Sequence, residues 1–175
     1  EYAIAVKKQY GMSCVNLLMT NLYGAGDDFR DETSHVIPAL IKKVVSAKEN
    51  NEEKIVAWGD GTPTRDFVYV SDAAKAIVAS ASIDYELPIN IGSGKDISIK
   101  NLYNLICQIA GFDGEVFWDT TRPNGQPKRL LDISKAQTLF GFEPNIGFEK
   151  GLKLTFDWYM SNRKEIDKLA PKHKN

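Results

Sequence analysis

Two periods alternate in the hydrophobic and polar pattern of the chain, one typical of strands and the other of helices. Short apolar runs predict strands at residues 14–19, 54–58, 65–70, 89–91 and 115–118. Spacings of three and four predict helices with one apolar face, as in the set Ile37, Leu40, Ile41, Val44 and Val45. Because strands and helices alternate along the chain, the pattern predicts an α/β fold.

Capping residues refine where the helices begin and end. Serines are expected to cap four helices at their first turn, and these are Ser34, Ser71, Ser98 and Ser134. Glycines are expected to end three helices, at Gly11, Gly111 and Gly141. A helix is predicted over residues 2–10 and a final one over 148–169, with a frayed tail at 172–175. Residues 20–32, 59–63 and 121–126 are predicted loops, and the strand at 14–19 is expected to be buried and parallel.

Composition and charge exclude some functions. The 175 residues carry a net charge of −1, so nothing suggests a nucleic-acid or membrane surface. The chain is long enough for one domain, and none of its apolar runs has the length of a membrane span. Cys14 and Cys107 lie in apolar runs without metal-ligand spacing, which predicts core thiols in a reducing, cytoplasmic compartment.

The segment from Trp58 to Asp72 carries the most chemistry. A Gly-Asp-Gly-Thr-Pro turn separates Trp58 from Arg65, and a short apolar strand follows. A planar indole and a forked guanidinium on one loop suit a ligand that has a flat ring and a phosphate.

Three motifs in order carry a family resemblance: Thr20-Asn-Leu-Tyr-Gly24, Ser34-His-Val-Ile-Pro-Ala-Leu40 and the Trp58–Asp72 segment. The chain resembles the extended short-chain dehydrogenase/reductases, and among them the C-terminal part of the GDP-L-fucose synthases. The resemblance implies a single fragment, residues 1–175, that binds the nucleotide-sugar, with residues 1–22 as the tail of a Rossmann part whose N-terminal strands are absent. Enzymes of this kind epimerise GDP-4-keto-6-deoxy-D-mannose at C3 and C5 and reduce C4 with NADPH. The resemblance therefore implies a GDP-sugar substrate, an NADP cofactor and a homodimeric full-length protein.

Two motifs of that family are missing from the chain. None of the Gly-x-Gly pairs has the third glycine and strand–turn–helix setting of a dinucleotide site, and none of the seven tyrosines has a lysine four residues later. We therefore expect the chain alone to lack reductase activity, and NADPH to be bound mainly by the other half of the enzyme. Without upstream strands, the strand at 14–19 is expected to have an unpaired edge or an exposed apolar patch.

The resemblance assigns roles around the first two motifs. His35 becomes the proton donor of the epimerisation and a cofactor neighbour, although a lone histidine at a helix start is more often structural. Met19, Thr20, Asn21 and Leu22 would lie against the nicotinamide end of the cofactor, with Asn21 also touching substrate. Met19 replaces the proline of the family motif, which removes a rigid backbone angle.

The resemblance also assigns the substrate contacts, which are Lys43, Trp58, Arg65 and Arg122. Lys42 is an alternative to Lys43, and both could equally be solvent-facing lysines. Arg65 could instead form a salt bridge with Asp66 or Asp72. A metal site is not implied, because His35 and His173 are far apart in the sequence.

Two alternative functions stay open. The chain could belong to another nucleotide-sugar epimerase or dehydratase of the same group, although those enzymes generally do not need His35 as an acid. It could also be a catalytically silent module that senses a nucleotide-sugar or cofactor.

Overall fold

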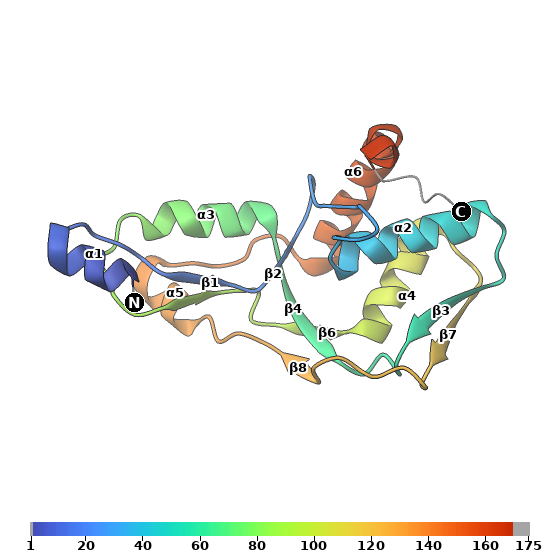
Figure 1. Ribbon diagram of the computed structural model, residues 1–175, viewed down its shortest axis with the longest axis horizontal. Coiled ribbons are helices and arrows are strands. Elements are labelled where there is room, and N and C mark those ends of the chain that lie inside the picture. The colour runs from blue at the N-terminus through green and yellow to red at the C-terminus, as the bar shows by residue number, and fades with distance from the viewer. Residues whose placement is uncertain (1, 170–175) are drawn as a thin grey trace. The chain divides into compact units, whose positions relative to one another are not determined.

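The chain has an α/β fold, as the alternating pattern predicts (Figure 1). The computed structural model describes residues 2–169, so the expected fraying of residues 172–175 lies outside the described part. Helices occupy Tyr2–Tyr10 (α1), Val36–Glu49 (α2), Val70–Ser80 (α3), Ile99–Ala110 (α4), Ser134–Phe140 (α5) and Phe148–Leu169 (α6). Strands occupy Leu17–Met19 (β1), Asn21–Tyr23 (β2), Lys54–Trp58 (β3), Thr64–Tyr69 (β4), Ile89–Ile91 (β5), Asp96–Ser98 (β6), Glu115–Asp119 (β7) and Lys128–Arg129 (β8).

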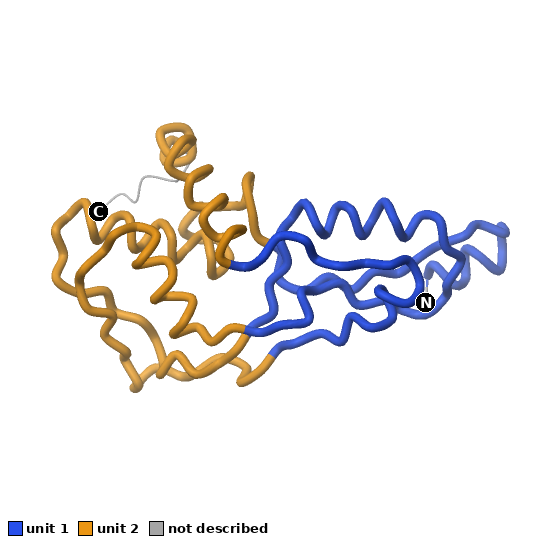
Figure 2. The backbone as a smooth tube through the Cα atoms, turned by 180° about the vertical axis from the view of Figure 1, so that it is seen from behind, with its two compact units in different colours: residues 1–22, 65–96, 129–148 blue, residues 23–64, 97–128, 149–175 orange. Residues whose placement is uncertain are grey.

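Two compact units divide the chain, each assembled from three separate segments (Figure 2). Unit 1 comprises Glu1–Leu22, Arg65–Asp96 and Arg129–Phe148. Unit 2 comprises Tyr23–Thr64, Ile97–Lys128 and Glu149–Asn175. The boundary expected after residue 22 coincides with the first division point, but residues 1–22 share their unit with two later segments.

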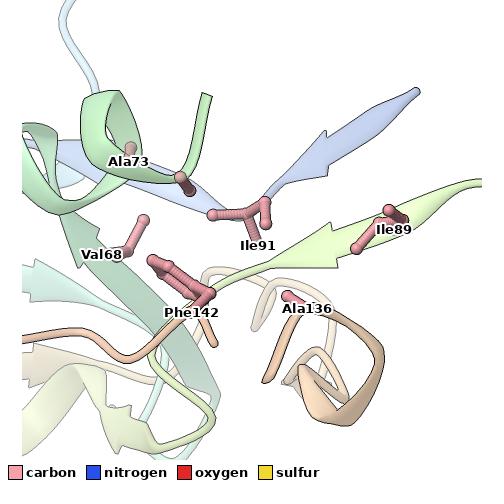
Figure 3. Packing of buried hydrophobic residues seen from close by; sticks show 7 residues of the cluster. Val68, Ala73, Ile89, Ile91, Ala136 and Phe142 are labelled. Atoms are coloured by element: carbon pink, nitrogen blue, oxygen red, sulfur yellow. The ribbon is translucent and has the colours of Figure 1, made fainter. Parts of the chain in front are cut away.

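Unit 1 is built around the parallel pair β1 and β5, in which Leu17 lies opposite Ile89 and Met19 opposite Ile91. Its core is a cluster of small and branched side chains from β4, α3, β5 and α5, closed by Phe142 (Figure 3). Both isoleucines of β5 are fully buried, because β5 is covered on both faces. This packing fixes the carboxyl ends of β1 and β5.

Unit 2 also contains a parallel strand pair, β3 and β7, in which Lys54 lies opposite Glu115 and Trp58 opposite Asp119. The apolar face of α2 predicted from the 3.6 period is confirmed, since all five of its members are buried. This face packs on α4 and β3. Helix α4 begins at Ser98 and ends at Gly111, whose φ of 63° places it in the left-handed region that favours glycine.

A third sheet has the order β2-β4-β6, with β8 also paired to β4. The sequence pattern predicts β4 but not β2, β6 or β8, because each of these three strands has only two or three residues. Such short strands have too few positions to display a period of two. Residues 20–32 are therefore not one continuous loop, since β2 lies within them.

Of the four serines expected to cap helices, one is confirmed. The Ser98 hydroxyl accepts a hydrogen bond from the Asn101 backbone N–H at 3.2 Å. Helix α2 begins after His35 rather than at Ser34, and α3 begins before Ser71. Helix α5 starts at Ser134 itself, whose N–H donates to the Asp132 carboxylate at 2.9 Å. In the three wrong predictions the helix starts one or two residues away from the position that would make serine the cap.

The strand predicted at 14–19 is shorter and less buried than expected. Regular pairing covers Leu17–Met19 alone, and Leu18 is 51% exposed. Within the described residues β1 pairs only with β5, so its other edge is unpaired, as predicted. Cys107 is buried in α4 as expected, whereas Cys14 is only partly buried. None of the described helices is long and apolar enough to cross a membrane.

Candidate functional site

Two loops meet at the carboxyl ends of β3 and β7 in unit 2. Trp58 ends β3 and is 70% exposed, although its strand neighbours Ile55 and Ala57 are buried. The Arg122 guanidinium lies over the Trp58 ring, 5.3 Å from the ring centroid. Parallel strands place ligand-binding loops at their carboxyl ends. Trp58 and Arg122 therefore form an exposed aromatic and cationic surface, which we call the unit 2 loop surface.

Hydrogen bonds to short acidic side chains fix these two loops. The Asp60 carboxylate accepts from the Thr62 N–H at 2.9 Å and from its hydroxyl at 2.7 Å. Asp119 accepts in the same way from Thr121, at 3.1 Å and 2.5 Å. These bonds lower the pKa of both carboxyl groups, chiefly through the threonine hydroxyls. Asn124 joins the loops, because its side-chain oxygen accepts from the Asp60 N–H at 3.0 Å.

Unit 1 carries a different polar cluster at the carboxyl ends of β1 and β5. Its centre is Asp66, which is fully buried. The Asp66 backbone carbonyl accepts from the Thr20 hydroxyl at 3.0 Å and from the Asn21 side-chain amide at 2.8 Å. Its carboxylate Oδ1 accepts from the Ser93 N–H at 2.9 Å and the Ser93 hydroxyl at 2.6 Å. We call these four residues the Asp66 cluster.

The members of the cofactor motif lie around this cluster in unit 1. Thr20 is 8% exposed, and its N–H donates to the Ile91 carbonyl at 2.9 Å. Leu22 is 38% exposed, and Met19 packs against the unit 1 core. The side chains of Thr20 and Asn21 thus form hydrogen bonds within the protein, whereas the side chain of Leu22 is exposed.

Arg65 lies beside a second arginine that the sequence analysis missed. Partial burial lowers the pKa of Arg65 first, and the positive charge of Arg129 lowers it further. Both residues belong to unit 1. The only sequence signal for Arg129 is its place after the Pro127 turn.

His35 lies in unit 2, exposed, at the start of α2. Its backbone carbonyl accepts the first helical hydrogen bond, from the Ala39 N–H at 3.0 Å, while its side chain makes no capping bond. Asp27 is partly buried in the preceding loop, and its carboxylate interacts electrostatically with His35.

Lys43 takes part in a structural contact. Its ammonium donates a hydrogen bond to the Val56 carbonyl on β3, and desolvation lowers its pKa. Lys42 pairs with Asp31 at 2.7 Å. Both lysines line a cavity of about 450 Å³ together with Asp31, Ser34, Ala39, Ser46, Ala47 and Glu52. The two lysines are therefore equally placed to meet a ligand in this cavity.

The sequence-derived site residues thus fall into two sets. Unit 1 holds Met19, Thr20, Asn21, Leu22 and Arg65, and unit 2 holds His35, Lys43, Trp58 and Arg122. The structure brings Thr20 and Asn21 together on Asp66, and Trp58 together with Arg122. Among residues 2–169, no group of three or more histidine, cysteine, aspartate and glutamate side chains is placed to hold a metal ion.

Comparisons with known proteins show the family of the chain. The NAD dependent epimerase/dehydratase family model matches residues 1–92. The chain is 41% identical over 159 residues to GDP-L-fucose synthase 1 of Arabidopsis thaliana, covering 90% of this chain and 49% of the relative. It is 40% identical over 159 residues to GDP-L-fucose synthase of Sinorhizobium fredii, covering 90% and 50%.

A solved structure shares the fold over nearly the whole chain. The GDP-L-fucose synthetase of Naegleria fowleri bound to NADP superposes with a TM-score of 0.84 at 29% identity. The match covers 98% of this chain and 53% of that protein. The chain therefore spans about half the length of the relatives it matches.

Proposed function

Because the chain belongs to the NAD dependent epimerase/dehydratase family, we propose that it is the substrate-binding part of a GDP-L-fucose synthase. The observation that carries the proposal is the match of relatives with that name, from a plant and a bacterium, to nine tenths of the chain. The complete enzyme would epimerise GDP-4-keto-6-deoxy-D-mannose at C3 and C5 and then reduce C4. The two exposed cationic and aromatic sites described above are consistent with a GDP-sugar ligand.

In this proposal each unit contributes groups that suit a nucleotide-sugar. In unit 2 the exposed indole of Trp58 would stack on a flat ring of the ligand, and Arg122 and Lys43 would supply positive charge. In unit 1 Arg65 would bind phosphate, since a planar guanidinium reaches two phosphate oxygens at once.

His35 would act as the acid of the epimerisation. A carbon next to the sugar ketone loses its proton on one face, and the resulting enolate takes a proton from the imidazole on the other face. The exposed ring of His35, which makes no capping bond, is available for this transfer. The partner that removes the first proton would lie in the other half of the enzyme.

Residues of the cofactor motif fit the nicotinamide end of NADPH. Leu22 offers an exposed apolar side chain, and the Asn21 amide is fixed through its nitrogen on Asp66, so its oxygen remains an acceptor for a carboxamide N–H. NADPH, when bound, supplies the hydride for reduction at C4. The chain's own contribution would be to hold that end of the cofactor and exclude water from it.

We further propose that the full-length protein is a cytoplasmic homodimer. The two cysteines, which form no disulfide in the described residues, are consistent with a reducing compartment. Light scattering of the full-length protein tests the dimer, and a monomeric mass would contradict it.

The decisive experiment is turnover by the full-length protein with GDP-4-keto-6-deoxy-D-mannose and NADPH. Wild-type protein should oxidise NADPH and release GDP-L-fucose. The present chain alone should oxidise none, because it has neither the glycine turn nor the Tyr-x-x-x-Lys pair. Binding of GDP-sugar and NADPH without turnover would instead support a sensing module, and turnover of a different nucleotide-sugar would support another epimerase.

Variants at two positions separate the steps. His35→Gln should slow solvent-deuterium exchange at sugar C3 and C5 by roughly two to four orders of magnitude, with unchanged NADPH affinity. Arg65→Lys should weaken GDP binding about ten- to a hundredfold, the equivalent of about 1.5–3 kcal/mol for a charge-assisted bond. A large fall in melting temperature with unchanged GDP affinity would show that Arg65 is structural.

A further inference from the structure

The carboxylate of Asp27 has one oxygen without a partner. Asp27 lies in the loop between β2 and α2, where its N–H donates to the Gly24 carbonyl at 3.3 Å. Its Oδ1 accepts from the Asp28 N–H at 2.8 Å, whereas Oδ2 is buried and has no hydrogen-bond donor. A buried carboxylate oxygen without a donor costs free energy. Asp66 Oδ2 is a second such oxygen, but the Asp27 oxygen differs from it in lying in the loop that leads to His35.

The rest of the loop is fixed, so this oxygen cannot easily turn to solvent. The Asp28 carboxylate accepts from the Arg30 guanidinium at 2.9 and 2.7 Å and from the Thr33 hydroxyl at 2.6 Å. The Ser34 N–H donates to the Arg30 carbonyl at 2.9 Å. These bonds close a short turn that leads directly to His35.

His35 lies at the end of this loop, as the residue before the first turn of α2, and its side chain makes no capping bond. An acid catalyst must carry a proton near neutral pH. The Asp27 carboxylate in the same loop interacts electrostatically with His35, an attraction that opposes the rise in the Asp27 pKa caused by burial.

We propose that Asp27 is the positioning residue for His35, with its unpaired oxygen accepting the imidazolium N–H and so holding the protonated ring toward the sugar. This inference rests on the proposed role of His35 in epimerisation. Two charges act on the Asp27 carboxylate: His35 lowers its pKa and Asp28 raises it, while burial, the largest effect, also raises it. The unpaired Asp27 oxygen thus suits the His35 imidazole, which is positive only when it carries a proton.

The first test is Asp27→Asn in the full-length protein, with solvent-deuterium exchange at C3 and C5 as the measurement. Asparagine keeps an acceptor for the Asp28 N–H but places an amide opposite the ring, which an imidazolium cannot use. Exchange should fall roughly tenfold or more, and its high-pH limb should move to lower pH, since one pKa unit is a tenfold change in protonated fraction. NADPH affinity should not change.

The matched control is Glu32→Gln, which removes an exposed carboxylate from the same loop without touching Asp27. It should leave the exchange rate and its pH profile unchanged. The melting temperature of Asp27→Asn should stay level or rise at neutral pH, because a buried charge without a donor is removed. An unchanged pH profile in a folded Asp27→Asn protein overturns the inference.

A second test uses the present chain and needs no activity. Carbon-detected NMR should show that His35→Gln raises the Asp27 pKa further, because the one charge that lowers it is lost. An unchanged Asp27 titration would overturn the inference even if His35 is the acid. If the full-length protein shows no exchange at all while the titration does shift, the proposed function fails and the Asp27–His35 coupling stands.

Discussion

The strand pairs β1–β5 and β3–β7 are built alike but end differently. Both are parallel pairs with partly exposed strands, and both present loops at their carboxyl ends. After β1 and β5 the polar side chains turn inward and bind the fully buried Asp66. At the ends of β3 and β7, in contrast, Trp58 is 70% exposed and the Arg122 guanidinium lies over its ring.

The Trp58–Asp72 segment contributes to both regions, with an exposed Trp58 in one and a buried Asp66 in the other. Between Trp58 and Asp66 the chain changes from an exposed aromatic residue to a buried acid within eight positions. Buried polar groups that bond within the protein favour one conformation, whereas exposed cationic and aromatic groups keep their surfaces for a ligand. Within the described residues the Asp66 Oδ1 is bonded in this way, and its Oδ2 has no hydrogen-bond donor. We therefore expect substitutions in the Asp66 cluster to change stability and substitutions in the unit 2 loop surface to change binding.

The largest stability effect is expected for Asp66→Ala. It leaves the Ser93 N–H without its acceptor and a cavity at a fully buried position, at a cost of about 2–4 kcal/mol in the free energy of unfolding. The Ser93 hydroxyl can still donate to the Lys95 carbonyl. Urea denaturation measures this cost. Asp66→Asn is the matched control and should cost less, because its side-chain oxygen can still accept both bonds. Equal stability of Asp66→Ala and wild type would remove the distinction between the two strand pairs.

A smaller loss is expected for Gly92→Ala. A β-carbon at this position would lie 2.3 Å from the Asp66 Oδ2, so the buried carboxylate would have to move. Overpacking of this kind costs about 1–3 kcal/mol. In a double-mutant cycle the penalty should shrink when Asp66 is already alanine, since the clashing atom is gone. Additive effects would show that the two residues do not press on each other.

Trp58→Ala should show the opposite behaviour. Its unfolding free energy should change by less than about 0.5 kcal/mol, because the side chain is mostly exposed. Its affinity for GDP should fall about five- to a hundredfold, given that stacking on an aromatic side chain contributes about 1–3 kcal/mol per base. Calorimetric titration and a thermal melt of one sample measure both. Trp118→Ala, on the neighbouring strand, is the contrasting variant, because Trp118 packs edge-on against buried Tyr103 and should lose stability.

The smallest effect is expected from acid on the two Asp–Thr turns of the unit 2 loop surface. The folded-state pKa of Asp60 and of Asp119 lies below the ordinary value of about 3.9. Their hydrogen bonds therefore contribute fully at neutral pH and are lost only as the pH falls through these lowered values. Amide chemical shifts of Thr62 and Thr121 between pH 7 and pH 2 should show this. A midpoint at or above the ordinary value would contradict it.

The sequence predicts the long elements well, because hydrophobic periodicity needs several turns or strand positions to show itself, and it predicts the three-residue strand β5 from two isoleucines followed by a glycine turn. The strand at 54–58, the strand at 89–91 and the helices at 2–10 and 148–169 are confirmed to the residue. Strand β2 is invisible in the same pattern, since its three residues include an exposed leucine and a buried tyrosine. Its pairing with β4 depends on contacts between distant segments, which local propensity does not encode.

The candidate site was also only partly predictable from the sequence, because some of its residues lie outside recognisable motifs. Trp58 and His35 stand in motifs, and the structure places both on the surface, at the start or end of a regular element. Asp27 and Arg129 carry no motif, so only their spatial neighbours, His35 and Arg65, identify them. The sequence offered Asp66 and Asp72 only as alternative salt-bridge partners for Arg65, and the described hydrogen bonds of the Asp66 carboxylate go to Ser93.

The interleaving of the two units also determines when the chain can fold during its synthesis. Strand β1 must wait for β5, about seventy residues later, and the core of unit 1 is incomplete until Phe142 has emerged from the ribosome. Unit 2 waits longer still, because Tyr159 of α6 stacks on Phe29 with ring centroids 4.5 Å apart. Pairing across such sequence distances is slow and leaves apolar strands exposed in the nascent chain. The period in which these apolar segments lack their partners therefore extends until α6 has been made.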